Sequence, residues 1–177
     1  MADQTPAELA PASRTRTVSW GDPAIALHAA PGRSGLELLR GILFGDIPAP
    51  PMAALIGLEP VSAESGSVVF ALTPGEHLYN PLGVVHGGAL ATLLDTALGC
   101  AVLSVLPKGR SYTTVELHIN FVAPVTLSTG RVVCNAVVLH AGGRMATAEA
   151  KLRDVNGKLY AHATTTCFIL AAAASPP

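Results

Sequence analysis

The longest apolar stretch of the chain lies at its centre, from Val84 to Leu106. Its residues predict one helix from Ala89 to Leu106, and Pro107 ends it because proline cannot continue a helix. At ~1.5 Å per residue, a helix of roughly 18 residues is about 27 Å long, enough to cross a small domain. Because this helix is apolar on nearly every side, we expect it to lie buried in a core.

One narrow face of this helix departs from the apolar pattern. Asp95 is the only charged residue between Val84 and Pro107. A buried carboxylate is costly unless it is paired, hydrogen-bonded or protonated, so Asp95 is either a satisfied core residue or a functional group. Residues three and four positions apart share a helix face, and this face consists of Thr92, Asp95, Thr96 and Gly99.

The start of the helix favours the functional interpretation. His86, Gly87 and Gly88 open it. A helix N-terminus offers unpaired N–H groups and partial positive charge, and glycines let a ligand come close to the backbone. The helix therefore carries an anion-stabilising end and, about two turns later, a carboxylate. Hydrolysis of an acyl ester or thioester needs this pair of groups.

Strand-like segments surround the helix. Alternation is clearest over 113–121, where we expect Thr113, Val115, Leu117, Ile119 and Phe121 to be buried and Thr114, Glu116, His118 and Asn120 to be wet or at an interface. Tight turns such as Asn156-Gly157 make successive strands antiparallel, so the chain is predicted to be an α+β fold. The predicted strands are 58–62, 67–72, 113–121, 131–139, 145–153 and 158–170.

The N-terminal third divides into two parts. Residues 1–33 lack periodicity and are predicted to be a loose tail. Residues 34–51 are predicted to hold a short helix, which starts with a capping box at Ser34 and Glu37, and a proline-rich connector. Residues 52–171 then form the main domain.

Composition narrows the class of protein. The chain has 177 residues, of which 50% are hydrophobic and 13% charged, so we expect one domain with much surface buried in an oligomer. A net charge of −1 gives no basic surface for nucleic acid. The central helix could span a bilayer by length, but Asp95 near its middle would cost roughly 2.5–3.5 kcal/mol, so no membrane is expected.

The remaining composition points to the cytoplasm and to chemistry without a cofactor. Cys100, Cys134 and Cys167 are isolated, which is typical of free thiols in a reducing compartment. We see no secretory leader, so a cytoplasmic location is expected. The sequence lacks the H-E-x-x-H and G-x-G-x-x-G patterns, so neither a metal nor a dinucleotide cofactor is predicted.

Three groups with characteristic spacing carry a family resemblance. Asn80 precedes His86-Gly87-Gly88 by six residues, and Asp95 follows His86 by nine. This pattern resembles the PaaI-like branch of the hotdog thioesterases, over roughly residues 50–170. The resemblance implies a sheet wrapped around one long central helix, and hydrolysis of an acyl-CoA thioester to free acid and CoA.

The resemblance also implies roles for individual residues. Asp95 would be the general base for water or a nucleophile, and the Gly87 N–H would hold the carbonyl oxygen. Asn80 would position the carbonyl or the water, His86 would support the loop, and Thr114 would orient the water. Sites in this family lie between two subunits, so a homodimer or a dimer-of-dimers homotetramer is expected.

Substrate contacts are less specific in the sequence. Gly88, Thr92 and Thr96, along the central helix, are predicted to contact the substrate. Lys108, Arg110 and Arg144 are candidates for the CoA phosphates, with solvated surface charges as the alternative. His118 stands where many relatives carry Asn, which leaves its role open. The rival function is a protein that binds acyl-CoA without cleaving it, although such a protein has no need of a buried acid.

Overall fold

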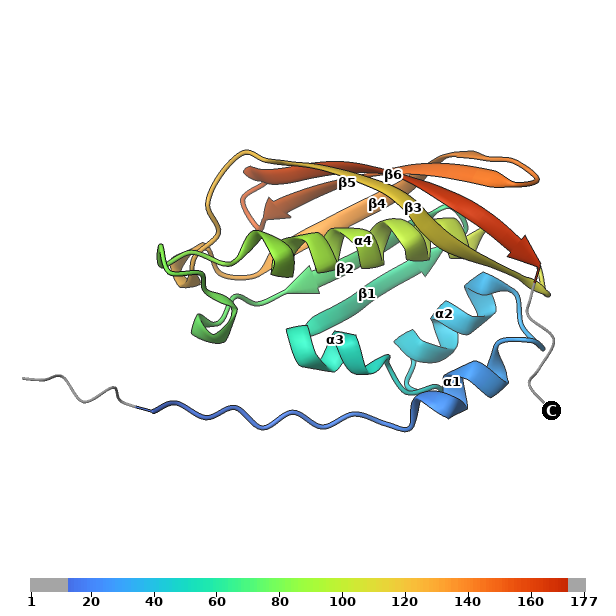
Figure 1. The fold of residues 1–177 in the computed structure, drawn as a ribbon, viewed down its shortest axis with the longest axis horizontal. Helices are drawn as coiled ribbons and strands as arrows, with labels where there is room; N and C mark the ends of the chain where they lie inside the picture. The colour runs from blue at the N-terminus through green and yellow to red at the C-terminus, as the bar shows by residue number, and fades with distance from the viewer. Residues whose placement is uncertain (1–12, 172–177) are drawn as a thin grey trace, which may run out of the picture.

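A computed structural model describes residues 13–171 of the chain. Within this range, six antiparallel strands form one sheet in the order β1-β2-β4-β5-β6-β3, which curls around the long helix α4 (Figure 1). The expected α+β fold is confirmed. The helices are α1 (Pro23–Ala29), α2 (Gly35–Leu43), α3 (Pro51–Ile56) and α4 (Gly87–Ser104), and the strands are β1 (Leu58–Glu64), β2 (Ser67–Leu72), β3 (Arg110–Phe121), β4 (Val132–Ala141), β5 (Met145–Asp154) and β6 (Leu159–Ala171).

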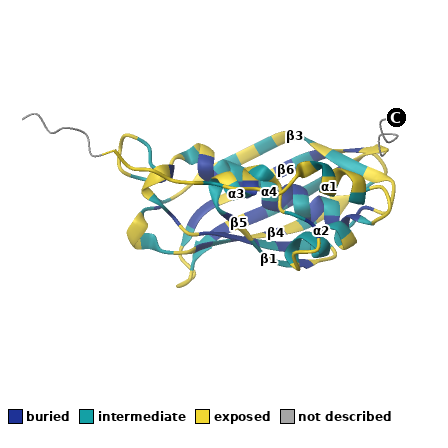
Figure 2. Ribbon diagram, turned by 90° about the horizontal axis from the view of Figure 1, so that it is seen from below, coloured by how far each residue is buried: buried dark blue, intermediate teal, exposed yellow. Residues whose placement is uncertain are grey.

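The core lies between α4 and the inner face of the sheet (Figure 2). Ala146, Ala148 and Ala150 of β5 are buried and face α4. Their small side chains let the helix approach the sheet closely, as the alternation of this segment indicates. On α4 itself, Leu93, Leu94 and their neighbours one turn on are fully buried.

Helix α4 is the one segment among residues 13–171 that is long and apolar enough to cross a membrane. Its mean hydropathy is 1.4, and 56% of it is buried inside the domain. The core helix of a globular domain passes the same test, and the contacts of α4 with the sheet make it such a helix. The cytoplasmic location stays a prediction.

The predicted burial of the 113–121 strand is wrong for part of its length. The pairing of β3 with β6 shifts between Thr114 and Glu116, so that Val115 is an extra, bulged residue. A β-bulge reverses the parity of side chains beyond it. Val115 is therefore 56% exposed, while Thr114 lies on the same side of the strand as the partly buried Leu117.

The predicted tail of residues 1–33 contains a helix that the pattern does not indicate. Helix α1 begins after Asp22, whose side chain accepts a hydrogen bond from the Ala24 N–H at 2.9 Å, and it has no buried residue. Residues 1–12 lie outside the described part of the chain. The capping box at Ser34 and Glu37 is confirmed at the start of α2, and the division into domains stays a prediction.

Candidate active site

Asp95 lies in the middle of α4 and faces the edge strand β3. The Thr114 hydroxyl donates a hydrogen bond to Asp95 Oδ1 at 3.0 Å. Asp95 is partly buried in the single chain, so the expectation of a buried acid is met only in part. The bulge at Val115 is what turns Thr114 toward Asp95, because regular alternation would place Thr114 opposite Leu117.

Tyr112 is a second β3 residue beside Asp95, and the sequence pattern missed it. Its ring lies against α4 at Gly99, where an added Cβ would come within 2.2 Å of the Tyr112 hydroxyl oxygen. Burial, with smaller contributions from Cys100, Cys167 and Asp95, raises the pKa of the Tyr112 phenol well above its usual value. The phenol is therefore a neutral wall of the site, and Gly99 is the residue that makes room for it.

The N-terminus of α4 is built by His86. The ring Nδ1 of His86 accepts a hydrogen bond from the Gly88 N–H at 2.8 Å, so the ring carries its proton on Nε2 when neutral. The His86 N–H donates to the Leu78 carbonyl at 2.7 Å, which fixes the entry of the chain into the helix. Within residues 13–171 the Gly87 N–H has no acceptor, which leaves it available to an oxyanion.

Asn80 organises the loop before α4. Its Oδ1 accepts hydrogen bonds from the N–H groups of Leu82 at 2.9 Å and Val84 at 3.4 Å. These two bonds fix the orientation of the side chain, and its amide nitrogen, which is its donor group, can bond an oxygen of a substrate. Asn80 and Gly87 line one cavity of about 360 Å³.

Phe121 lines this cavity and is another residue that the sequence analysis missed. Its ring would lie 3.5 Å from a Cβ added at Gly87, and half of its surface is exposed. Its position at the end of β3, predicted as a core position, gave no signal of this contact. The full lining of the cavity is Asn80, Val84, Val85, Gly87, Leu90, Phe121, Val122, Ala123, Pro124 and Val125.

Gly87 and Asp95 of one chain do not meet. They are eight positions apart on one helix, which at 1.5 Å per residue separates them by about 12 Å along its axis. A single carbonyl group cannot contact both at hydrogen-bond distance. The structure thus holds the two expected reactive groups in one helix without bringing them together in one chain.

The predicted substrate contacts are scattered. The Thr92 hydroxyl donates to the Gly88 carbonyl at 2.9 Å, and Thr96 lines a different, apolar cavity. Lys108 follows the far end of α4, where its amine is 3.9 Å from a Glu37 carboxylate oxygen. Two further residues flank the last residues of β6: Arg110, which pairs with Ala171, and Arg144, whose carbonyl accepts from the Ile169 N–H. None of these cations contacts Asp95 in the described residues.

His118 and the thiols stand apart from the reactive groups. His118 is exposed on β3, with its Nδ1 3.4 Å from the side-chain nitrogen of Asn120. Burial, with a smaller effect of the Asp95 charge, raises the pKa of the Cys100 thiol to about 12, and burial raises that of Cys134 to about 12. Neither is a thiolate near neutral pH. Among residues 13–171 no cluster of three His, Cys, Asp or Glu side chains could hold a metal ion.

The central part of this chain is similar in sequence to known proteins. The family model described as the Thioesterase superfamily matches residues 82–161. Human acyl-coenzyme A thioesterase 13 is 32% identical over 107 residues, which are 60% of this chain and 75% of that protein. The matched regions span between 35% and 83% of the length of such curated relatives.

Solved structures share the fold over a larger part of the chain. The conserved protein PA5202 from Pseudomonas aeruginosa is 38% identical, with a TM-score of 0.65, over 69% of this chain and 95% of its own. A phenylacetic acid degradation-related protein from Ralstonia eutropha JMP134 is 28% identical, with a TM-score of 0.67, over 73% of this chain and 98% of its own. These two structures and the present chain share the same fold, a sheet wrapped around a central helix.

Proposed function

The chain belongs to the thioesterase superfamily, in its PaaI-like hotdog branch, and from that premise we propose that it hydrolyses an acyl-CoA thioester in a site shared by two copies of the chain. The products are the free acid and CoA. The observation that carries the proposal is the pair of groups on α4: Asp95, held by Thr114, and the unpaired N–H of Gly87.

Asp95 activates water, with Thr114 fixing the carboxylate. As the water oxygen attacks the carbonyl carbon, its proton passes to Asp95 and the carbonyl oxygen becomes an oxyanion. The C–S bond then breaks, and the CoA sulfur leaves with the proton that Asp95 held. Direct attack by Asp95, through an anhydride that water opens, uses the same residues and is the second route.

The oxyanion donor comes from the other copy. Because Gly87 and Asp95 are about 12 Å apart along one helix, the Gly87 N–H of the partner subunit must face Asp95. Asn80 beside it donates from its amide nitrogen, and His86 holds the helix end in place. Preorganised donors of this kind stabilise the charge that develops in the transition state.

The bare edge of the sheet supports such a pairing. β3 is the last strand of the sheet, and none of its twelve residues, all within the described range, is buried. A long exposed edge with apolar side chains is a template for pairing with another chain. Pairing two β3 edges would place two α4 helices side by side, and the expected dimer or tetramer is part of this proposal.

The basic residues are proposed to bind the phosphates of CoA. Arg110 and Arg144 flank the end of β6, and neither has an acidic partner among residues 13–171, whereas Lys108 lies near Glu37. A guanidinium group matches phosphate oxygens in bidentate geometry, so the two arginines suit this role better than Lys108.

The test is Asp95→Asn, which keeps the shape of the side chain but removes the base. We expect kcat to fall by about 10²–10⁴-fold, with KM for acyl-CoA little changed because the lost interaction belongs to the transition state. The melting temperature should hold, since the amide can still accept the bond from Thr114.

The control is Asp46→Asn, the same change at an exposed loop position. It should leave both kcat and the melting temperature unaltered. If Asp95→Asn melts at a lower temperature yet keeps the wild-type kcat, Asp95 is a structural residue and the mechanism is wrong.

A further inference from the structure

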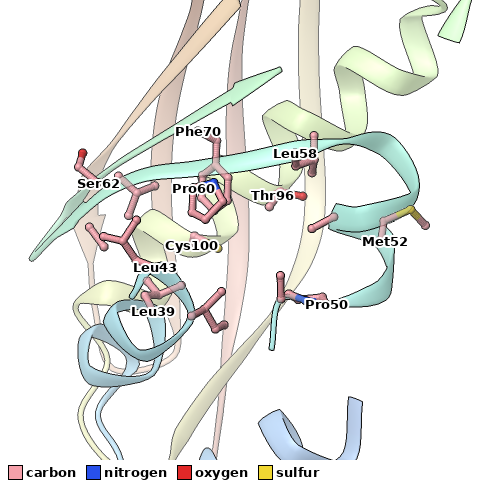
Figure 3. Close-up of a pocket in the computed structure, with 15 residues that line it drawn as sticks. Leu39, Leu43, Pro50, Met52, Leu58, Pro60, Ser62, Phe70, Thr96 and Cys100 are labelled. Atoms are coloured by element: carbon pink, nitrogen blue, oxygen red, sulfur yellow. The ribbon is translucent and has the colours of Figure 1, made fainter. Parts of the chain in front are cut away.

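An apolar cavity lies beside the middle of α4, where the N-terminal helices meet the sheet (Figure 3). Its volume is about 110 Å³, and all but three of its lining residues are apolar, the exceptions being Ser62, Thr96 and Cys100. In Figure 3, Phe70 and Leu58 close it on the side of the sheet, and Leu39 and Leu43 on the side of α2. Its lining comes from α2, the segment between α2 and α3, α3, β1, β2 and α4.

The walls of this cavity are anchored to the rest of the domain. At the start of α2, the Gly35 N–H donates to the Leu106 carbonyl at 3.0 Å, and an added Cβ would lie 1.8 Å from the Leu103 oxygen. Further along α2, Arg40 donates to the Ala63 carbonyl at 3.2 Å and pairs with Glu64 at 2.6 Å. These contacts hold α2 against both α4 and β1, so the cavity is formed before any ligand arrives.

The cavity touches the helix beside the proposed base. Thr96 is the residue after Asp95, and Cys100 lies one turn further along. The Asp95 charge makes a small contribution to the raised pKa of the Cys100 thiol, after burial. A thioester carbonyl held at Asp95 can therefore direct its acyl group past Thr96 into the cavity.

We propose that this cavity binds the acyl group of the thioester, and that the walls from α2 and α3 restrict it to a compact apolar group of about four to six carbons. An apolar cavity of ~150 Å³ accommodates benzene, so one of this volume holds a group of similar or smaller size. The inference rests on thioester hydrolysis at Asp95 and adds the class of acyl group. The matched family region begins at residue 82, so these walls lie outside it.

A chain-length series measures this selection. kcat/KM for acetyl-, butanoyl-, hexanoyl-, octanoyl- and palmitoyl-CoA should rise by about fourfold per buried methylene up to about six carbons. Beyond that length the increase should stop, because further carbons find no room among the fixed walls.

Two variants alter the cavity in opposite directions. Ala53→Leu enlarges a side chain in the wall from α3 and so fills part of the cavity. It should lower kcat/KM for hexanoyl-CoA at least tenfold, while kcat/KM for acetyl-CoA stays within twofold of wild type. Leu43→Ala removes part of the wall from α2, which enlarges the cavity and should raise the preferred length of the acyl chain. The control is Leu55→Ala on α3, an exposed position outside the cavity, which should leave the length profile as it is.

The outcomes separate the two proposals. If wild-type protein hydrolyses acyl-CoA but neither Leu43→Ala nor folded Ala53→Leu changes the length profile, the cavity assignment is wrong and the mechanism at Asp95 stands. If Ala53→Leu does not fold, Leu43→Ala against Leu55→Ala decides. Wild-type protein that cleaves no member of the series overturns both proposals.

Discussion

The two edge strands of the sheet, β1 and β3, differ in how far the rest of the chain covers them. At the β1 edge, the N-terminal segment packs alongside, and Arg40 bonds the backbone carbonyl of Ala63. At the β3 edge, the described residues provide no cover of this kind, and the strand bears Thr114 and Tyr112 beside Asp95. Each edge strand contains a bulge at an exposed valine, Val61 in β1 and Val115 in β3.

Each half of the proposed site comes from one of these two edges. An edge covered by the chain's own helices encloses an apolar cavity, which suits selection of an acyl group. An edge left bare keeps its backbone groups free for a second copy, which suits a site that needs Gly87 from the partner. Substitutions at matched positions on β1 and β3 can therefore test whether acyl selection and pairing with a second copy belong to different edges.

Among the substitutions that compare the two edges, the largest effect is expected from a charge on the bare edge. Val115→Glu should convert the protein to a monomer, because like charges would face each other across paired β3 strands. A monomer lacks the oxyanion donor, and loss of one such donor costs about 10²–10³-fold in kcat. Sedimentation and turnover on the same sample measure both effects.

Val61→Glu is the matched control, since Val61 is 42% exposed on β1 against 56% for Val115 on β3. It should sediment and turn over like wild type. If Val115→Glu stays dimeric and active, β3 is not the interface, and the shared site must be placed elsewhere.

A smaller loss is expected from Thr114→Val, which removes the hydroxyl bonded to Asp95. Hydrogen bonds to charged groups contribute about 1.5–3 kcal/mol, so kcat should fall roughly 10–100-fold with the dimer intact. Thr113→Val, one residue earlier on the exposed side of β3, should be neutral. Equal kcat values for the two variants would remove Thr114 from the mechanism.

Stability rather than turnover should change at Gly99→Ala. The added methyl would meet the Tyr112 hydroxyl oxygen at 2.2 Å, and overpacking of this kind costs about 1–3 kcal/mol. At Gly87 an added Cβ meets only the Phe121 ring at 3.5 Å, so Gly87→Ala should melt close to wild type. Thermal unfolding of the pair checks this, and similar melting temperatures would mean that Tyr112 moves aside freely.

The smallest effect on turnover is expected at Cys100→Ala. Since burial raises the pKa of the Cys100 thiol to about 12, the thiol is neutral at pH 7 and acts neither as base nor as nucleophile. kcat for acetyl-CoA should stay within about twofold of wild type. Loss of turnover with an unchanged melting temperature would mean that the reactive group has been misplaced.

The same thiols make stability depend on pH. Unfolded thiols ionise near their ordinary pKa of 9.0, but the folded Cys134 thiol resists ionisation up to about pH 12. Stability is therefore fully present below pH 9 and falls as the pH rises toward 12. Melting curves of Cys134→Ala between pH 8 and pH 11 should show a shallower decline than wild type, and equal slopes would contradict the burial argument.

Much of this protein followed from local sequence. Helix α4, the capping box of α2 and strand β2 depend on residues near one another in the chain, so periodicity and capping chemistry predict them. Asn80, His86, Gly87 and Asp95 also lie close together in the sequence, on one loop and the helix that follows it, so their spacing was visible without the fold. These features needed no knowledge of how the strands pair.

The other features depend on contacts between residues that are distant in the sequence. Pairing of β3 with β6 inserts the bulge at Val115, which turns Thr114 toward Asp95 and Val115 outward, and no alternation along β3 alone encodes that shift. The cavity beside Thr96 exists because α2 docks on α4 and β1, through contacts between residues 23 to 71 positions apart. Side-chain direction in a strand and enclosure of a cavity both depend on residues that are distant in the sequence. Because the rigid helix α4 holds Gly87 and Asp95 about 12 Å apart, the proposed site needs a second chain to complete it.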